Sequence, residues 1–142
     1  MSEPVDHEII EAAREIIRKR YKEDRHAIGA AIRTRSGGLY VGVHLEANVG
    51  RIAVCGEAIA LGAAATAGDT DIAQIVAVTE SGDIVPPCGM CRELISDYAS
   101  DALVILETDE GIVCVPVSEL LPEKYDREKY SNRLREEGDT EA

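Results

Sequence analysis

Residues 56 to 67 form a run of small and apolar residues that leaves few choices of fold. Glu57 is the only charged residue in the run, and many alanines accompany Ile59 and Leu61. A helix that is apolar on every side must be buried between other elements. Gly68 follows directly and is a plausible C-cap. We therefore expect the chain to fold around one buried helix.

Before this run, the pattern predicts one helix and two strands. Residues 5–22 carry apolar side chains at helical spacing with charges between them, which is typical of an amphipathic helix. These apolar residues are Val5, Ile9, Ile10, Ala13, Ile16, Ile17 and Tyr21. Residues 27–34 and 39–45 are apolar and partly β-branched on either side of the Ser-Gly-Gly sequence at 36–38, which predicts a β-hairpin.

The rest of the chain continues to alternate. We predict strands at 72–79, 103–106 and 112–117, helices at 89–99, 118–121 and 126–137, a loop at 46–54 and an acidic tail at 138–142. Ser118 is the expected N-cap of the short helix. Strands interleaved with helices, one of them buried, predict a single domain over residues 1–137. Its expected fold class is α/β, a three-layer α/β/α sandwich around a mixed sheet of about five strands.

The formal net charge of −12 over 142 residues narrows the range of partners. Such a surface repels phosphate backbones and anionic membranes, so we expect no nucleic-acid or membrane partner and favour an uncharged or cationic small molecule. The chain has no long apolar stretch and no apolar core of a signal peptide, which predicts a cytoplasmic protein. Four cysteines in a reducing compartment are more typical of metal ligands or core residues than of disulfides.

Cys88 and Cys91 form a C-x-x-C pair directly after Pro86 and Pro87. Alone, the pair is compatible with half of a zinc site, with a redox dithiol or with chance. A redox dithiol typically follows a strand in a thioredoxin-like setting, with an aromatic residue ahead of the first cysteine. Two prolines stand there instead, so the pair favours zinc.

A third cysteine, Cys55, lies at the start of the buried helix, as Cys88 and Cys91 lie at the start of the next one. Helix N-termini favour the thiolate, so two that converge would place three thiolates around one point. Three protein ligands with one open position are typical of a catalytic zinc, whereas a structural zinc takes four. Cys114 could complete a four-cysteine structural site, but its apolar strand pattern favours a buried, inert thiol.

Glu57 lies two residues after Cys55, too close to turn back as a fourth ligand but able to flank the open position. A carboxylate there can take a proton from a zinc-activated water and pass it to a substrate. The alternative is an ordinary first-turn glutamate that complements the helix dipole. In a helix with no other charge we favour the catalytic role.

Residues 55–57 (Cys-Gly-Glu) and 87–92 (Pro-Cys-Gly-Met-Cys-Arg) together resemble the motif of the small cytidine deaminases with three-cysteine zinc sites, including blasticidin-S deaminase-like relatives. Weaker matches at 28–31 and 120–122 extend the resemblance over most of the chain. The two-part motif is specific, and the outer matches are less so.

The resemblance implies a zinc-dependent hydrolase that replaces the amino group at C4 of a cytosine nucleoside and releases ammonia. By this resemblance, Cys55, Cys88 and Cys91 bind the zinc and Glu57 moves the protons. A structural zinc protein, a thiol redox protein and, least favoured, a nucleic-acid-editing deaminase are the remaining alternatives.

The resemblance also implies substrate contacts by Glu46, Gly56, Tyr125 and His44. Members of the family are typically homotetramers in which an aromatic residue at the position of Tyr125 reaches a neighbour's pocket, although Tyr125 could simply cover a helix end. An Asn-x-Glu pair usually grips the ribose, and here His44 takes the Asn position, while His26 stands where Phe is frequent. The resemblance implies cytidine or deoxycytidine as the substrate. The altered sugar side motivates the alternative, another aminopyrimidine nucleoside such as a blasticidin-like antibiotic.

Three thiolates give the zinc site a net negative charge, which weakens the metal as a Lewis acid. Members with three cysteines often place one arginine after the motif glutamate and another after the last cysteine, and here these positions hold Ala58 and Arg92. We therefore expect Arg92, with the helix dipoles or with Arg51, to offset the charge. Arg92→Ala should lower turnover about 10-fold or more while zinc stays bound.

Overall fold

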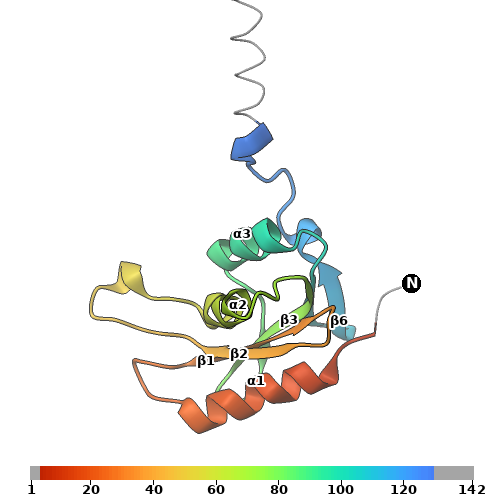
Figure 1. The fold of residues 1–142 in the computed structure, drawn as a ribbon. Helices are drawn as coiled ribbons and strands as arrows, with labels where there is room; N and C mark the ends of the chain where they lie inside the picture. The colour runs from red at the N-terminus through yellow and green to blue at the C-terminus, as the bar shows by residue number, and fades with distance from the viewer. Residues whose placement is uncertain (1–3, 130–142) are drawn as a thin grey trace, which may run out of the picture.

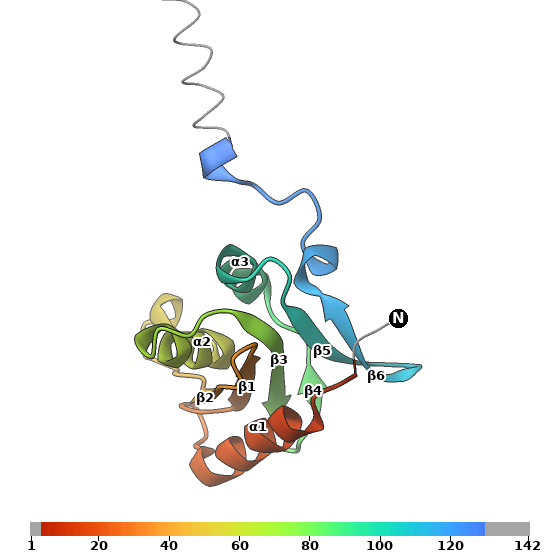
Figure 2. The same ribbon diagram turned by 45° about the vertical axis from the view of Figure 1, so that its right-hand side comes forward.

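The computed structural model describes residues 4–129, and these form three layers (Figure 1). A mixed sheet lies in the middle, helix α1 (His7–Arg20) covers one face, and helices α2 (Gly56–Thr66) and α3 (Gly89–Tyr98) lie together on the other (Figure 2). This confirms the expected α/β/α sandwich. The predicted domain end at 137, most of the predicted helix at 126–137 and the acidic tail lie outside the described residues.

The sheet contains five strands in one path and a sixth, short strand beside them. The strands are β1 (Ile28–Thr34), β2 (Leu39–Val43), β3 (Ile72–Thr79), β4 (Ile84–Val85), β5 (Leu103–Thr108) and β6 (Gly111–Pro116). Their order is β2-β1-β3-β5-β6, and β4 pairs with β3. The β3–β5 pair is parallel and the other pairs are antiparallel, so the sheet is mixed as expected.

The sheet separates two apolar cores, because successive side chains of a strand point to opposite faces. In β1, Ala31 packs with α1 on one side, whereas Ala30 and Ile32 pack with α2 and α3 on the other. Both faces of β1 and β3 are therefore covered, which explains their nearly continuous apolar runs.

Two glycines allow the helices to approach the sheet closely. A Cβ atom at Gly29 would lie 2.6 Å from the carbonyl oxygen of Ala13 in α1. A Cβ atom at Gly42 would lie 2.5 Å from the backbone nitrogen of Ala60 in α2. Both distances are shorter than real Cβ contacts, so a larger residue at either position would push a helix outward.

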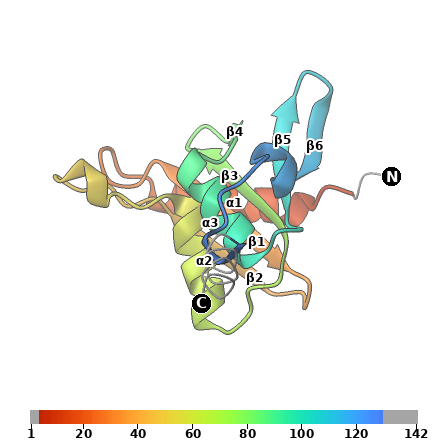
Figure 3. The same ribbon diagram turned by 90° about the horizontal axis from the view of Figure 1, so that it is seen from above.

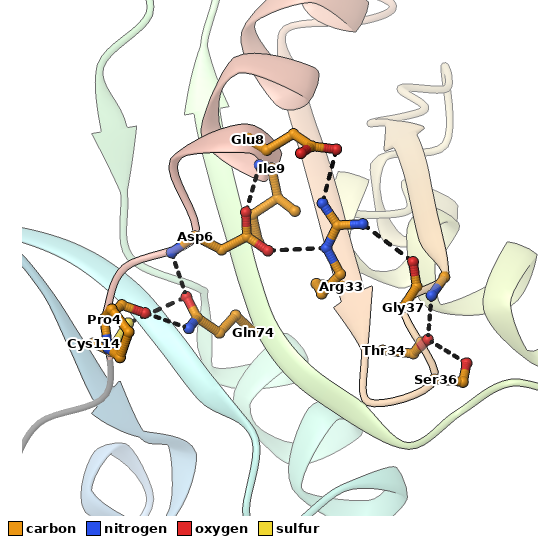
Figure 4. A network of polar contacts seen from close by, with 11 residues as sticks. Pro4, Asp6, Glu8, Ile9, Arg33, Thr34, Ser36, Gly37, Gln74 and Cys114 are labelled. Carbon is orange, nitrogen blue, oxygen red and sulfur yellow. Dashed lines mark hydrogen bonds and ion pairs between the residues drawn. The ribbon is translucent and has the colours of Figure 1, made fainter.

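The segment before α1 is held on the sheet by the polar network in Figure 4. The side-chain oxygen of Gln74 accepts a hydrogen bond from the backbone N–H of Asp6 at 2.9 Å and from the thiol of Cys114 at 3.3 Å. The Gln74 amide donates to the carbonyl of Pro4 at 2.8 Å. The Asp6 carboxylate caps α1 and pairs with Arg33 of β1 at 2.9 Å, so one network fixes α1 against the sheet.

The ends of two helices test individual expectations. The predicted C-cap of α2 is wrong by one residue, because Ala67 is the C-cap and Gly68, with a φ of +72°, takes the left-handed position just beyond it. The predicted N-cap role of Ser118 is wrong, because the short 3-10 helix η2 (Val117–Leu120) already begins one residue earlier, after Pro116, and has no side-chain cap. Within residues 4–129, none of the helices has the length and apolar character needed to cross a membrane.

Candidate metal centre and active site

Three cysteines meet where α2 and α3 begin. Cys55 is the N-cap residue of α2 and Cys88 that of α3, and neither side chain caps its helix. Cys91 lies in the first turn of α3 and is buried. The three Sγ atoms lie within 4.8 Å of one another, and those of Cys55 and Cys88 are 3.5 Å apart. In the part of the chain that the structure describes, no other group of cysteine, histidine and acidic ligands gathers in this way.

The spacing of the sulfur atoms fits a zinc ion. Zn–S bonds of about 2.3 Å in a tetrahedron place two sulfur atoms about 3.8 Å apart. The observed spread agrees with this value, and thiolate sulfur is a preferred ligand of zinc. The trio can therefore occupy three corners of a tetrahedral site, with both helix N-termini directed toward it.

The ionisation of these thiols shows why a cation belongs here. Burial raises the pKa of Cys55, and Cys88 and Glu57 raise it further, although a hydrogen bond with Cys91 acts in the opposite direction. Burial also raises the pKa of Cys91, and Glu57, Cys55 and Cys88 raise it further. For Cys88, partial burial opposes ionisation, but backbone N–H groups of Cys91 and Met90 and the thiol of Cys55 hold its pKa below the usual range. Three sulfurs and a carboxylate this close cannot all ionise unless a positive charge joins them.

Glu57 is buried beside the cysteines. Its exposed fraction is 6%, and it shares a narrow, largely apolar recess with Ala77, Val85 and Pro87. Burial raises the pKa of its carboxyl group. An ordinary first-turn glutamate is exposed, as Glu8 of α1 is with 73% of its side chain accessible. The position of Glu57 therefore argues for chemistry rather than for helix capping.

His44 and Glu46 form an ordered pair beyond β2. The Nδ1 atom of His44 accepts the backbone N–H of Ala27 at 2.8 Å, so the neutral ring carries its proton on Nε2, 3.5 Å from the Glu46 carboxylate. The Nδ1 atom of His26 lies 2.9 Å from the carbonyl oxygen of His44. A hydrogen bond from the Ala47 N–H, which has the larger effect, and one from His44 hold the pKa of Glu46 below its usual range. The pair thus presents a carboxylate.

Gly56 joins this pair to the cysteines. A Cβ atom there would lie 3.2 Å from the carbonyl oxygen of Ile28 and 3.5 Å from the backbone nitrogen of His44. Tyr125, by contrast, is 68% exposed and lines a surface hollow with Tyr98 of α3, and no cysteine lines that hollow. The three cysteines and Glu57 therefore lie together, and Gly56 links them to the pair of His44 and Glu46. Tyr125 lies apart from them on the outer surface.

Cys114 lies on the other side of the sheet. It packs against the core under α1, whereas Cys55 and Cys91 pack under α2 and α3. Its thiol donates to Gln74, and it is half-buried rather than fully buried. A four-cysteine site that includes Cys114 is therefore incompatible with this fold.

Arg92 makes contacts that sequence reasoning missed. Its Nε atom donates to the carbonyl of Pro87 at 2.8 Å, and one terminal nitrogen donates to the carbonyl of Leu120 at 3.2 Å. That the charge of Arg92 offsets the charge of the thiolates stays a prediction. Backbone carbonyl groups carry no sequence signature, so residue types alone could not indicate these contacts.

Comparison with known proteins gives consistent matches. The family model described as the cytidine and deoxycytidylate deaminase zinc-binding region matches residues 4–107. The chain is 46% identical over 130 residues to blasticidin-S deaminase from Bacillus cereus, covering 86% of this chain and 93% of the relative. It is 33% identical over 110 residues to a cytidine deaminase from Halalkalibacterium halodurans, covering 76% and 83%.

Solved structures agree with the fold. The cytidine deaminase of Burkholderia pseudomallei superposes with a TM-score of 0.72 at 26% identity, covering 86% of this chain and 100% of the other. The cytidine deaminase of Mycobacterium tuberculosis gives a TM-score of 0.73 at 21% identity, covering 87% and 99%. At this low identity the second match supports the fold alone.

Proposed function

Because the chain belongs to the cytidine and deoxycytidylate deaminase family and is a zinc-dependent hydrolytic deaminase, we propose that its substrate is a cytosine nucleoside. The observation that carries this proposal is the meeting of three cysteine sulfurs within 4.8 Å beside the buried Glu57. A redox dithiol would need neither the third sulfur nor the carboxylate.

In this proposal, Cys55, Cys88 and Cys91 would hold zinc by three sulfur atoms, the number of protein ligands that is typical of a catalytic zinc site. When bound, zinc supplies a Lewis acid that makes water nucleophilic at neutral pH. The helix N-termini at Cys55 and Cys88 stabilise the thiolates that such binding requires.

Glu57 carries the protons. The reaction joins the oxygen of water to the ring carbon that bears the amino group, breaks the C–N bond and releases ammonia. Glu57 takes one proton from the water and gives it to the ring nitrogen, and it then takes the second proton from the added hydroxyl group and carries it to the departing amine. Burial raises its pKa toward the range in which a carboxyl group both accepts and releases protons, and the recess of Ala77, Val85 and Pro87 limits contact with bulk water.

On the substrate side, we assign the backbone of Gly56 to the base and the pair of His44 and Glu46 to the sugar. An asparagine offers both a donor and an acceptor to a hydroxyl group, but the acceptor nitrogen of His44 is occupied by Ala27. His44 therefore orients Glu46, and the Glu46 carboxylate accepts from a hydroxyl or a cationic group of the substrate.

A nucleoside of the blasticidin-S type is a second candidate within the same chemistry. The 46% identity to the Bacillus cereus enzyme favours it. An open hollow of about 550 Å³ beside Glu46, lined also by Lys22 to Arg25, gives room for a substituent larger than a pentose. Plain cytidine would leave that hollow unused.

A panel of substrates tests both candidates. Zinc-loaded protein is incubated with cytidine, deoxycytidine and blasticidin S, and ammonia release is measured with the zinc content. Activity on any of the three that disappears in Glu57→Gln supports the proposal, and the preferred substrate decides between the candidates. Glu15→Gln, on the exposed face of α1, is the matched control and should retain wild-type turnover. Inactivity on the whole panel, or protein that binds no zinc, would contradict the proposal.

We also propose a homo-oligomer, a tetramer as the resemblance implies, in the cytoplasm and without nucleic-acid or membrane partners. In support, Tyr125 is 68% exposed, and Val49, Ile52 and Met90 expose large apolar side chains. The net charge of −12 disfavours polyanions as partners.

Light scattering tests the tetramer and should give four times the mass of the chain, whereas a monomeric mass would contradict it. If Tyr125 reaches a neighbour's pocket, Tyr125→Ala should raise KM.

A further inference from the structure

We propose that Arg92 is a positioning residue that couples zinc retention at Cys88 to the docking of the segment after η2. The inference rests on the zinc site proposed above. It differs from the expectation that Arg92 serves by its charge, because the groups that its side chain contacts are two backbone carbonyls.

The first half of the argument concerns the loop that carries Cys88. Cys88 is exposed and caps no backbone group with its side chain, so packing does little to fix it. Arg92 bonds the carbonyls on both sides of this residue. Its side chain donates to Pro87 at 2.8 Å, and its backbone N–H donates to Cys88 at 3.0 Å. One residue thus fixes the peptide groups that direct the Cys88 sulfur.

The second half concerns the segment after η2. The Leu120 carbonyl accepts from the Arg92 guanidinium at 3.2 Å. Four residues later, Lys124 donates to Ser96 at 2.7 Å and pairs with Asp97, both on α3. The segment is therefore tied to the first turn of α3 by Arg92 and to its last turns by Lys124. Figure 3 shows η2 and the following segment passing beside α3.

The geometry explains why arginine stands here. A guanidinium is a planar fork whose donors point in different directions, so it reaches two carbonyls at once. A lysine keeps the positive charge but has one nitrogen at the end of a flexible chain. Arg92→Lys therefore separates positioning from charge compensation.

The test measures zinc release from the zinc-loaded, full-length protein to a coloured chelator. We expect Arg92→Lys to release zinc about 10-fold faster than the wild type, as is typical when a residue that supports a metal ligand is lost. Arg14→Lys is the matched control, because Arg14 donates to the carbonyl of Gly82 on the α1 side at 3.0 Å. It should leave the rate unchanged. A wild-type rate in Arg92→Lys would overturn the inference and leave the proposed function intact.

Hydrogen exchange on the wild type provides a second test that needs no Arg92 variant. Stripping zinc should speed exchange at residues 88–92 and also at 117–125, with no change in β2. A response confined to 88–92 would overturn the coupling. Because coupling acts in both directions, Lys124→Met should speed both exchange after η2 and zinc release. Faster exchange after η2 with a wild-type rate of zinc release would overturn the coupling. Wild-type protein that binds no zinc would overturn the proposed function and this inference together.

Discussion

Two carboxylates stand at the two ends of α2 in opposite surroundings. Glu57, in the first turn, is buried in a largely apolar recess, and burial raises its pKa. Asp69, just beyond the last turn, accepts hydroxyl hydrogen bonds from Thr34 at 2.8 Å, Tyr40 at 2.9 Å and Ser36 at 3.0 Å. These donors, Thr34 first, hold the pKa of Asp69 below its usual range.

The difference in surroundings gives the carboxylates at the two ends of α2 different roles. Donors that already point at Asp69 favour its charged form and tie the β1–β2 hairpin to α2, which is a structural role. For Glu57, its own backbone N–H acts to lower the pKa, but burial outweighs it, so its pKa is raised and the protonated form is favoured. The same chemical group is thus a fixed anchor at one end and, in our proposal, a proton carrier at the other.

The largest expected effect is at the catalytic end. Glu57→Gln should lower turnover by roughly 100- to 10,000-fold, the usual share of general acid–base catalysis, because the amide cannot carry protons. Zinc content should stay unchanged, and the midpoint of thermal unfolding should not fall, since the substitution removes a desolvated carboxyl group. Steady-state kinetics, metal analysis and calorimetry on one preparation check all three. Turnover within 10-fold of the wild type would contradict the proton-carrier role.

Gly42→Ala, on the strand β2 that packs against α2, should displace the first turn of α2. The added Cβ would lie 2.5 Å from the Ala60 nitrogen and 2.9 Å from the Gly56 carbonyl oxygen. We expect a loss of about 1–3 kcal/mol in the free energy of unfolding and a clear fall in turnover as the first turn of α2 shifts. Denaturant unfolding and kinetics measure both.

Gly62→Ala, in the same helix, is the matched control for this prediction. A Cβ atom at Gly62 meets nothing within 4 Å, so this change should add about 0.5–1 kcal/mol of stability through helix propensity. If the two alanine variants behaved alike, the close approach at Gly42 would have no energetic weight.

The functional end of α2 was largely predictable from the sequence. The apolar run after Glu57 predicted a helix, which the structure confirms, but the predicted burial on every side is wrong, because the outer face of α2 is exposed at Gly62, Ala63, Ala65 and Thr66. The spacing of Cys55 and the C-x-x-C pair predicted that three cysteines meet at two helix starts, as they do. Both signals lie in short, local patterns. Glu57 stood out for the same reason, as the one charge in an apolar helix.

The contacts of Asp69, at the other end of α2, were not predictable, because they join distant parts of the chain. Nothing in the sequence near Asp69 indicates that it meets Thr34, 35 residues earlier. Two further contacts could not be predicted for a similar reason: the hydrogen bond from the Ala27 N–H to the His44 ring, and those from Arg92 to two carbonyls. Their partners are backbone groups, which every residue type has. Ser118 was misassigned because a 3-10 helix can begin at an apolar residue without a side-chain cap.

Asp69→Asn should have the opposite effect to Glu57→Gln: it should lower the stability and leave the turnover nearly unchanged. The amide keeps one acceptor oxygen but turns the other position into a donor facing hydroxyl groups, so the hairpin should be less firmly held. We expect a lower midpoint of thermal unfolding with turnover within about two-fold of the wild type, because Asp69 lies at the far end of α2 from the cysteines. A large loss of turnover with unchanged stability would reverse the assignment of the two ends.

The smallest effect is a pH dependence carried by Asp69. Since its pKa is lower in the folded chain than in the unfolded chain, the charged carboxylate stabilises the fold above the ordinary aspartate pKa of about 4. That contribution is lost as the pH falls through the lowered value. Asparagine does not titrate, so the stability difference between wild type and Asp69→Asn should be full at pH 7 and shrink in acid. Unfolding midpoints of both proteins across this range measure it, and a difference that grew on acidification would show that the hydroxyl donors do not favour the charged form.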